Sequence, residues 1–346
     1  MKLLRAIAVL VALSSLASIS AEAEGIPRLP RAQFDVIPPS SRVIGGRGHM
    51  QVWQAQCRIG PTHWARRRIV DVAVQEWGFF GFQTIDATQV ETHTLPPGIL
   101  PDAQNPLRTE PHIAHEALRI GTFEDDSDVD ATIGGYWSAT PKGAEVIEQQ
   151  DAAWNGPGGD AVNWVQPWSA AFVSWVMCEA GLGDMSQFAR SISHRTYIDQ
   201  AIRAHDALMK GEPVTSAYVA YDAGDQPIAP GDLLCNSRSG TDYRDLADRR
   251  PEMGEYAPAH CDIVVSVPPG GKRTLVIGGN VMQSVTLTIL PLDKGNKPYP
   301  HPVTAEDIQG GRTVFAHLKL QADPVEPDAL AHSPTIVALQ AQAARR

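Results

Sequence analysis

Three polar residues are of the types that hydrolytic enzymes combine: Ser169, His260 and Asn280. A nucleophile, a general base and an amide that orients the base are the three parts of a hydrolytic triad. Ser169 follows Pro167, which suits the first turn of a helix, and such a turn presents free N–H groups and a positive dipole end to an oxyanion. The residue types indicate acyl transfer, although a serine in this place is more commonly a cap or a small packing residue.

Asp262 is a second candidate for the group that orients the imidazole of His260. The two residues share a face if they lie on a strand, and a carboxylate is the electrostatically stronger partner. Cysteine is the other common nucleophile, but Cys178 lies nine residues after Ser169 and on the far side of the helix. Cys261 follows His260 directly and would point to the opposite face of the strand. Ser169 is therefore the preferred nucleophile.

Three further side chains are candidates for contacting a substrate. Trp168, beside Ser169, is placed to form a pocket wall. His194 and Tyr197 lie at the start of a second predicted helix. They either line the same cleft or form a helix cap with a packed tyrosine.

The hydrophobic pattern predicts the elements that would position these residues. Apolar residues recur at helical spacing over residues 62–82, 158–182 and 197–209. Short β-rich segments separated by Gly and Pro lie at residues 231–235, 262–267, 274–277 and 285–290. Helices first and strands afterwards indicate an α+β fold, in which the helix that carries Ser169 packs on a small antiparallel β-sheet.

The first 23 residues have the organisation of a secretory signal peptide. Lys2 and Arg5 are basic, residues 6–17 are apolar, and Ala21 and Ala23 flank Glu22 as at a cleavage site. The apolar run is too short to span a bilayer, and no cysteine follows it to accept a lipid. We expect a periplasmic or secreted bacterial protein without stable membrane insertion.

The rest of the 346-residue chain is expected to form a single domain over residues 51–320. Residues 24–50 are rich in Pro, Ser and Gly and indicate a linker or N-terminal arm. Residues 84–117 indicate an irregular insertion, and residues 321–346 indicate a flexible tail.

The charge of the chain excludes one class of partner. A formal net charge of -10, without a long run of Lys or Arg, argues against nucleic acid. The acidic run at residues 124–130 indicates a solvated loop or, as the second interpretation, a cation site that lacks the spacing of an EF-hand. No motif indicates a cofactor, and the four cysteines lack metal-ligand spacing. They could form two disulfides, with Cys235 and Cys261 the best pair because they lie on adjacent predicted strands.

Four ordered segments resemble the NlpC-like and CHAP-type peptidoglycan hydrolases. PWSAAFVSWV is similar to their nucleophile helix, PGDLLC to a Pro-Gly-Asp strand, AHCDIVVSV to the strand with the catalytic histidine, and IGGNVMQSV to a Gly-Gly-Asn strand. The resemblance implies a papain-like fold and a site formed by Ser169, His260 and Asn280. Those peptidases carry cysteine where this chain has Ser169, and a hydroxyl is a weaker nucleophile unless a base removes its proton.

A narrower resemblance is to the bacterial family called domain of unknown function 2272. The segments WSAAFVSWVM, SHRTYI, GDLLC, HCDIVV and GGNVMQSV carry it, over residues 68–318. It implies the fold and the site rather than a reaction.

Three functional interpretations remain open. The first is an envelope hydrolase that cleaves an amide or ester bond in cell-wall peptide or a related substrate, with Ser169 attacking and His260 as base. The second is a module that has lost catalysis and binds cell-wall peptide or a protein partner. The third, a metal site formed by His194, His260 and Asp262, has the least support because the ligand spacing of known metal hydrolases is missing.

Overall fold

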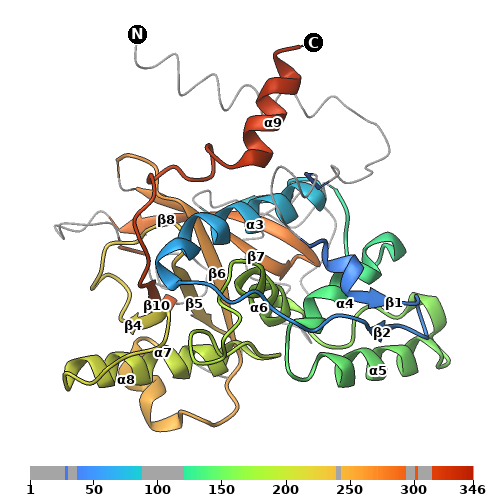
Figure 1. The fold of residues 1–346 in the computed structure, drawn as a ribbon, viewed down its shortest axis with the longest axis horizontal. Coiled ribbons are helices and arrows are strands. Elements are labelled where there is room, and N and C mark those ends of the chain that lie inside the picture. Colours follow the sequence, from blue (N-terminus) through green and yellow to red (C-terminus); the bar gives the residue numbers. More distant parts are fainter. Residues whose placement is uncertain are drawn as a thin grey trace, which may run out of the picture.

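The structure, a computed structural model, describes residues 28–29, 37–87, 121–238, 243–270, 272–293, 301–302 and 314–345. Within them the chain forms an α+β fold in which helices pack on one large β-sheet (Figure 1). The predicted signal peptide and residues 88–117 of the predicted insertion lie outside the described residues. No helix in the described part is long and apolar enough to cross a membrane.

The sheet has eight strands, more than the small sheet that the sequence predicted. Its order is β3-β8-β7-β6-β5-β10-β4, with β9 paired to β8. The strands are β3 (Thr84–Asp86), β4 (Tyr218–Tyr221), β5 (Leu233–Ser237), β6 (Ala259–Ser266), β7 (Arg273–Val281), β8 (Ser284–Asp293), β9 (His301–Pro302) and β10 (Val314–Leu320). All these pairs are antiparallel except β3 with β8. A separate ladder joins β1 (Val43–Ile44) to β2 (Gln51–Val52).

The predicted strands correspond to β5 to β8, whereas β10 was missed. Almost every residue of β10 is buried, and its apolar start, Val314 to Ala316, does not by itself distinguish a strand from a buried helix segment. It lies between β5 and β4, far from both in sequence.

The helices are α3 (Ala65–Phe79), α4 (Asp130–Ser138), α5 (Gly143–Trp154), α6 (Ser169–Glu179), α7 (His194–Met209), α8 (Leu246–Arg249) and α9 (Pro334–Ala343). Short 3-10 helices are η2 (Pro39–Arg42), η3 (Thr62–Trp64), η5 (Ser127–Val129), η6 (Gly159–Ala161) and η7 (Arg250–Glu252). Both α6 and α3 contact β6 and β7 and also contact each other, while α7 contacts β4, β6 and β10. These contacts bring the starts of α6 and α7 to the central strands.

The three predicted helices correspond to α3, α6 and α7, but α4 and α9 were not predicted. Gly134 and Gly135 give α4 low helix propensity. Its formation depends on packing, because a Cβ on Gly135 would overlap the backbone of Pro39. In the segment predicted as a flexible tail, α9 begins at a recognisable signal: the side chain of Ser333 accepts from the N–H of Ile336, and a proline follows.

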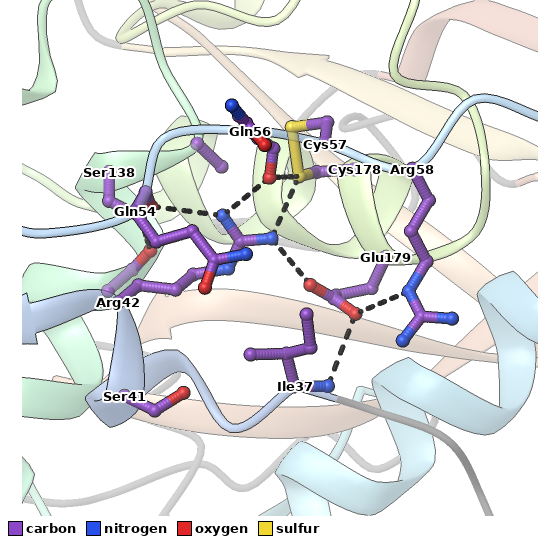
Figure 2. Close-up of polar contacts among 12 residues, drawn as sticks. Ile37, Ser41, Arg42, Gln54, Gln56, Cys57, Arg58, Ser138, Cys178 and Glu179 are labelled. Atoms are coloured by element: carbon purple, nitrogen blue, oxygen red, sulfur yellow. Dashed lines mark hydrogen bonds and ion pairs between the residues drawn. A yellow bond between two sulfur atoms is a disulfide. The ribbon is translucent and has the colours of Figure 1, made fainter.

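An N-terminal strap, defined here as residues 37–60, is fastened to the C-terminal end of α6 (Figure 2). Arg42 Nη2 donates to Glu179 Oε1 at 2.6 Å, and both side chains are fully buried. Arg58 approaches the second carboxylate oxygen of Glu179 at 3.3 Å. The strap overlaps the segment that was expected to be a linker or arm. The ion pairs place Arg42 and Arg58 at the C-terminal end of α6, where the helix dipole favours positive charge.

All four cysteines form disulfides. Cys57 of the strap is bonded to Cys178 of α6, and Cys235 is bonded to Cys261. Cys235 and Cys261 are direct partners on β5 and β6, which confirms the pairing predicted from adjacent strands. The bond to Cys57 also removes Cys178 from consideration as a nucleophile.

Asp232, from the Pro-Gly-Asp segment, is the centre of a buried ionic cluster. Its carboxylate accepts from Arg66 Nη1 at 2.9 Å, His317 Nε2 at 2.8 Å and Lys319 Nζ at 3.0 Å. Burial alone would raise the pKa of Asp232. The hydrogen bond and charge of His317, with the charges of Lys319 and Arg66, outweigh burial and lower this pKa from 3.8 to about 2.

We predict that Asp232→Asn destabilises the protein by about 3–5 kcal/mol, because it leaves buried cations unpaired. Since the folded-state pKa lies below 3.8, the ionised carboxylate stabilises the wild type above about pH 4. That contribution is lost as the pH falls from about 4 to about 2. Chemical denaturation as a function of pH measures the effect. Asp248→Asn, which removes a solvent-exposed ion pair with Arg244, is the control and should change stability far less.

Asp71 of α3 shows the opposite electrostatic behaviour. It is 7% exposed, and its Oδ1 atom is buried without a hydrogen-bond partner among the described residues. Burial, partly offset by Arg67, raises its pKa from 3.8 to about 7. The folded state therefore disfavours the ionised form.

We predict that Asp71→Asn stabilises the protein at pH 8 by about 4 kcal/mol relative to the wild type. The folded-state pKa is above the unfolded value, so the wild type loses stability as the pH rises from about 4 through about 7. The two proteins should converge below pH 4. Equal stabilities at pH 8 in urea denaturation would contradict this account.

Candidate functional site

Ser169 is the first residue of α6, and its side chain faces the start of α7. Its Oγ atom lies 2.7 Å from His194 Nε2, and the two residues are 3% and 4% exposed. The direct bond from Ser169 to His260 that a simple triad requires is not found among the described residues. His194, expected to contact substrate, is instead the partner of the nucleophile candidate.

The contacts of His194 assign its tautomer. Its Nδ1 atom accepts a hydrogen bond from the backbone N–H of Cys261 at 3.2 Å and also contacts the hydroxyl of Tyr197. A backbone N–H can only donate, so Nδ1 of the neutral imidazole carries no proton, and the proton is on Nε2. His194 therefore donates to Ser169 Oγ. It holds the oxygen but is not arranged to remove the hydroxyl proton.

His260, at the beginning of β6, is arranged differently. Its Nε2 atom lies 2.8 Å from Asp262 Oδ1, and the residue is 1% exposed. A carboxylate accepts, so the neutral ring carries its proton on Nε2 and has a lone pair on Nδ1. Within the described residues, this Nδ1 atom has no hydrogen-bond partner. The His260 ring lies 5.1 Å from the ring of His194, the partner of Ser169, measured between ring centroids.

The sequence suggested that Asn280 orients His260, but in the structure Asn280 has other partners. With its amide oriented to satisfy both neighbours, Oδ1 accepts from the backbone N–H of Trp168 at 3.1 Å and Nδ2 donates to Glu124 Oε2 at 3.3 Å. Its φ of 56° is in the left-handed region, which asparagine tolerates better than most residues. Asn280 thus caps the start of α6, and Asp262 orients the histidine.

Glu124 belongs to this site and was not singled out by the sequence analysis. Its Oε2 atom accepts from Trp168 Nε1 at 2.8 Å, and the residue is 6% exposed. Burial raises the pKa of Glu124; the hydrogen bond from Trp168 opposes the shift, and the charge of Asp125 adds to it.

The acidic run is only partly the solvated loop that was expected. Asp130, at its other end, is also buried and pairs with Arg47 at 2.5 Å, whereas residues 125–128 are exposed. Nothing in the local sequence distinguishes the buried acidic residues from the exposed ones, because long-range contacts decide which of them are covered.

Trp168 and Tyr197 are packed rather than open to solvent. Trp168 is fully buried and stacks with Phe80 and Tyr136 at centroid distances of 5.9 and 5.8 Å. Tyr197 is 1% exposed and stacks with Phe188. The structure thus favours the packed tyrosine that was left open as an alternative. It gives Trp168 a core position rather than that of a pocket wall.

Two adjacent glycines allow these groups to meet. A Cβ on Gly279 would overlap the Cβ of Phe172 in α6, and a Cβ on Gly278 would overlap Asp262 Oδ1. Only residues without side chains permit β7 to pass this close to α6 and to Asp262. Within the described residues, no cluster of three or more His, Cys, Asp or Glu could hold a metal ion.

We predict that NMR at pH 8 finds both His194 and His260 as Nε2–H tautomers, because Nδ1 of His194 faces an N–H donor and Nε2 of His260 faces a carboxylate. Long-range ¹H–¹⁵N correlation of imidazole nitrogens distinguishes protonated from unprotonated atoms. A protonated Nδ1 on His194 would overturn the assignment, since its Nε2 would then be the base that faces Ser169. Tyr197→Phe should leave the His194 tautomer unchanged, because the N–H of Cys261 remains.

Comparison with known proteins covers the region that carries this site. A family model described as "Uncharacterized protein conserved in bacteria (DUF2272)" matches residues 124–302. No curated protein and no solved structure matches the chain. The matched region spans more than half of the sequence and contains Glu124, Ser169, His194, His260 and Asn280. The chain therefore belongs to the DUF2272 family of bacterial proteins.

Proposed function

We propose that the protein is a serine hydrolase of the bacterial envelope, related in arrangement to the NlpC-like and CHAP-type peptidoglycan hydrolases. Ser169 is the nucleophile, His260 the general base, and Asp262 the group that orients it. The observation that carries the proposal is the place of His260: it is buried, held through Nε2 by a carboxylate, and its ring lies 5.1 Å from that of His194, the partner of Ser169. Its Nδ1 atom has no hydrogen-bond partner among the described residues and can accept a proton. His317 has the same bonding state in the buried ionic cluster, so nearness to the Ser169 pair is what distinguishes His260.

The hydrogen-bond directions fit a serine mechanism. Because His194 donates to Ser169 Oγ, the hydroxyl hydrogen of Ser169 is directed to another acceptor. In the proposed reaction it passes to His260 Nδ1 while Oγ attacks the acyl carbon. N–H groups in the first turn of α6 stabilise the oxyanion. The leaving group takes the proton from His260, and water, deprotonated by the same nitrogen, releases the acyl group.

The substrate we propose is an amide or ester in cell-wall peptide or a related envelope compound. The signal-peptide pattern supports export to the periplasm or the medium. The two disulfides support the same location, because stable disulfides are characteristic of oxidising compartments. The four segments that resemble cell-wall hydrolases supply the reason to choose this substrate.

A second candidate function is a binding module that has lost catalysis. The observation in its favour is the low exposure of Ser169 and His260, 3% and 1%, at positions where an enzyme requires access. The replacement of the usual cysteine by serine points the same way. The two candidates differ in whether Ser169 reacts.

We predict that a fluorophosphonate probe labels Ser169 in the mature wild type. Ser169→Ala should abolish both labelling and the hydrolysis of peptidoglycan or small ester and amide substrates, and His260→Ala should reduce turnover by about 10³-fold or more. Ser169→Cys should retain measurable turnover, since a thiol is the stronger nucleophile.

The matched control is Ser174→Ala, on the same helix. Ser174 is also buried, but its hydroxyl donates to the backbone oxygen of Ser191. This variant should be labelled like the wild type. If the wild type is neither labelled nor active while it still binds purified cell wall, the binding module becomes the better account.

A further inference from the structure

Among the described residues, Glu124 is a buried carboxylate without a counter-ion. Its Oε2 atom is held by Trp168 Nε1 and Asn280 Nδ2, both of them neutral donors. In the described part of the chain, Oε1 makes no hydrogen bond and no arginine, lysine or histidine pairs with Glu124. Within that part of the chain, the only charge found to act on Glu124 is Asp125, which repels it. Burying such a group costs free energy unless a cation pairs with it.

Glu124 lies beside the proposed nucleophile. Asn280 bridges its carboxylate to the backbone N–H of Trp168, and Trp168 directly precedes Ser169. The indole of Trp168 fixes the same carboxylate from the core side. The position of Glu124 is therefore set by the groups that form the start of α6, and any partner of Oε1 is close to the reacting atoms.

The chemistry of the free oxygen limits what the partner can be. A guanidinium is recognised best by two carboxylate oxygens in a fork, but here Oε2 already has two donors. Calcium or magnesium requires several oxygen ligands, and no cluster of three or more ligating side chains lies among the described residues. A primary ammonium is a compact charge that one carboxylate oxygen can bind.

We propose that Glu124 binds a primary ammonium of the substrate, so that the site selects acyl groups with a free amine close to the bond that Ser169 attacks. This inference rests on the proposed function for the identity of the reaction, but the ammonium site itself does not require catalysis. The sequence analysis gave a cation site as the second interpretation of the acidic run at residues 124–130. In the present proposal the cation is an organic ammonium, and Glu124 alone binds it.

The test compares an ester that has a free amine with one whose amine is acetylated and uncharged: alanine ethyl ester and N-acetylalanine ethyl ester, each as the L and the D form. For the L or the D form, we expect the wild-type kcat/KM for alanine ethyl ester to exceed that for N-acetylalanine ethyl ester of the same form by about 30-fold or more. In Glu124→Gln, which keeps an oxygen to accept from Trp168, the ratio should fall to about threefold or less. Asp128→Asn, which removes a nearby exposed carboxylate, should retain the wild-type ratio.

Binding is measured separately in Ser169→Ala, by calorimetry with alaninamide and N-acetylalaninamide. Only alaninamide should bind, and adding Glu124→Gln should weaken its binding by about 30-fold or more. Ammonium binding that depends on Glu124 without hydrolysis of either ester would support this inference and overturn the proposed hydrolase. Equal hydrolysis of both esters by the wild type would support the hydrolase and overturn the ammonium site. The comparison of the two esters by the wild type remains decisive even if Glu124→Gln fails to fold.

Discussion

The close contact between α6 and β7 is the constraint on which the site depends. Phe172 of α6 lies against Gly279, at a separation that leaves no room for a Cβ. At that separation, Asn280 reaches the backbone N–H of Trp168, and Gly278 leaves space for the pair formed by His260 and Asp262. A side chain at Gly279 would push β7 from α6 by about the size of a methyl group, and a side chain at Gly278 would displace the carboxylate of Asp262. Every polar contact across this interface would then lengthen.

His194 and His260 have the same tautomer but different roles, because their hydrogen-bond partners differ. Both carry the proton on Nε2, but His194 uses it to hold Ser169, whereas His260 uses it to bind Asp262. The backbone N–H of Cys261 occupies the lone pair of one ring, and the lone pair of the other is free. Cys261 is fixed in turn by its disulfide to Cys235. A residue adjacent to the proposed base thus determines the role of the second histidine.

The sequence predicted those parts of the fold that local patterns encode. The helices α3, α6 and α7 were predicted from apolar residues at helical spacing, and the strands β5 to β8 from short β-rich segments between Gly and Pro. Ser169, His260 and Asp262 were proposed as site residues from their type and order. The contact between Ser169 and His194 was not predicted, because nothing in a linear pattern shows that two helix starts meet. The same limit applied to Glu124, whose burial depends on a hairpin residue far along the chain: Gln283 O accepts from its backbone N–H. Helix α4 was missed because its packing on η2 overrides its low propensity.

The choice of Ser169 as the proposed nucleophile is consistent with the depth of the site. A catalytic cysteine rests as a thiolate paired with an imidazolium, and burying separated charges at 1–4% exposure would be costly. Serine stays protonated until attack, so the proposed mechanism separates no charge between Ser169 and His260 at rest. Charge then develops only in the transition state, at the N-terminus of α6, where the helix dipole favours it. Glu124, next to the start of α6, is a carboxylate for which the described residues supply no cation. In our proposal the substrate supplies that positive charge.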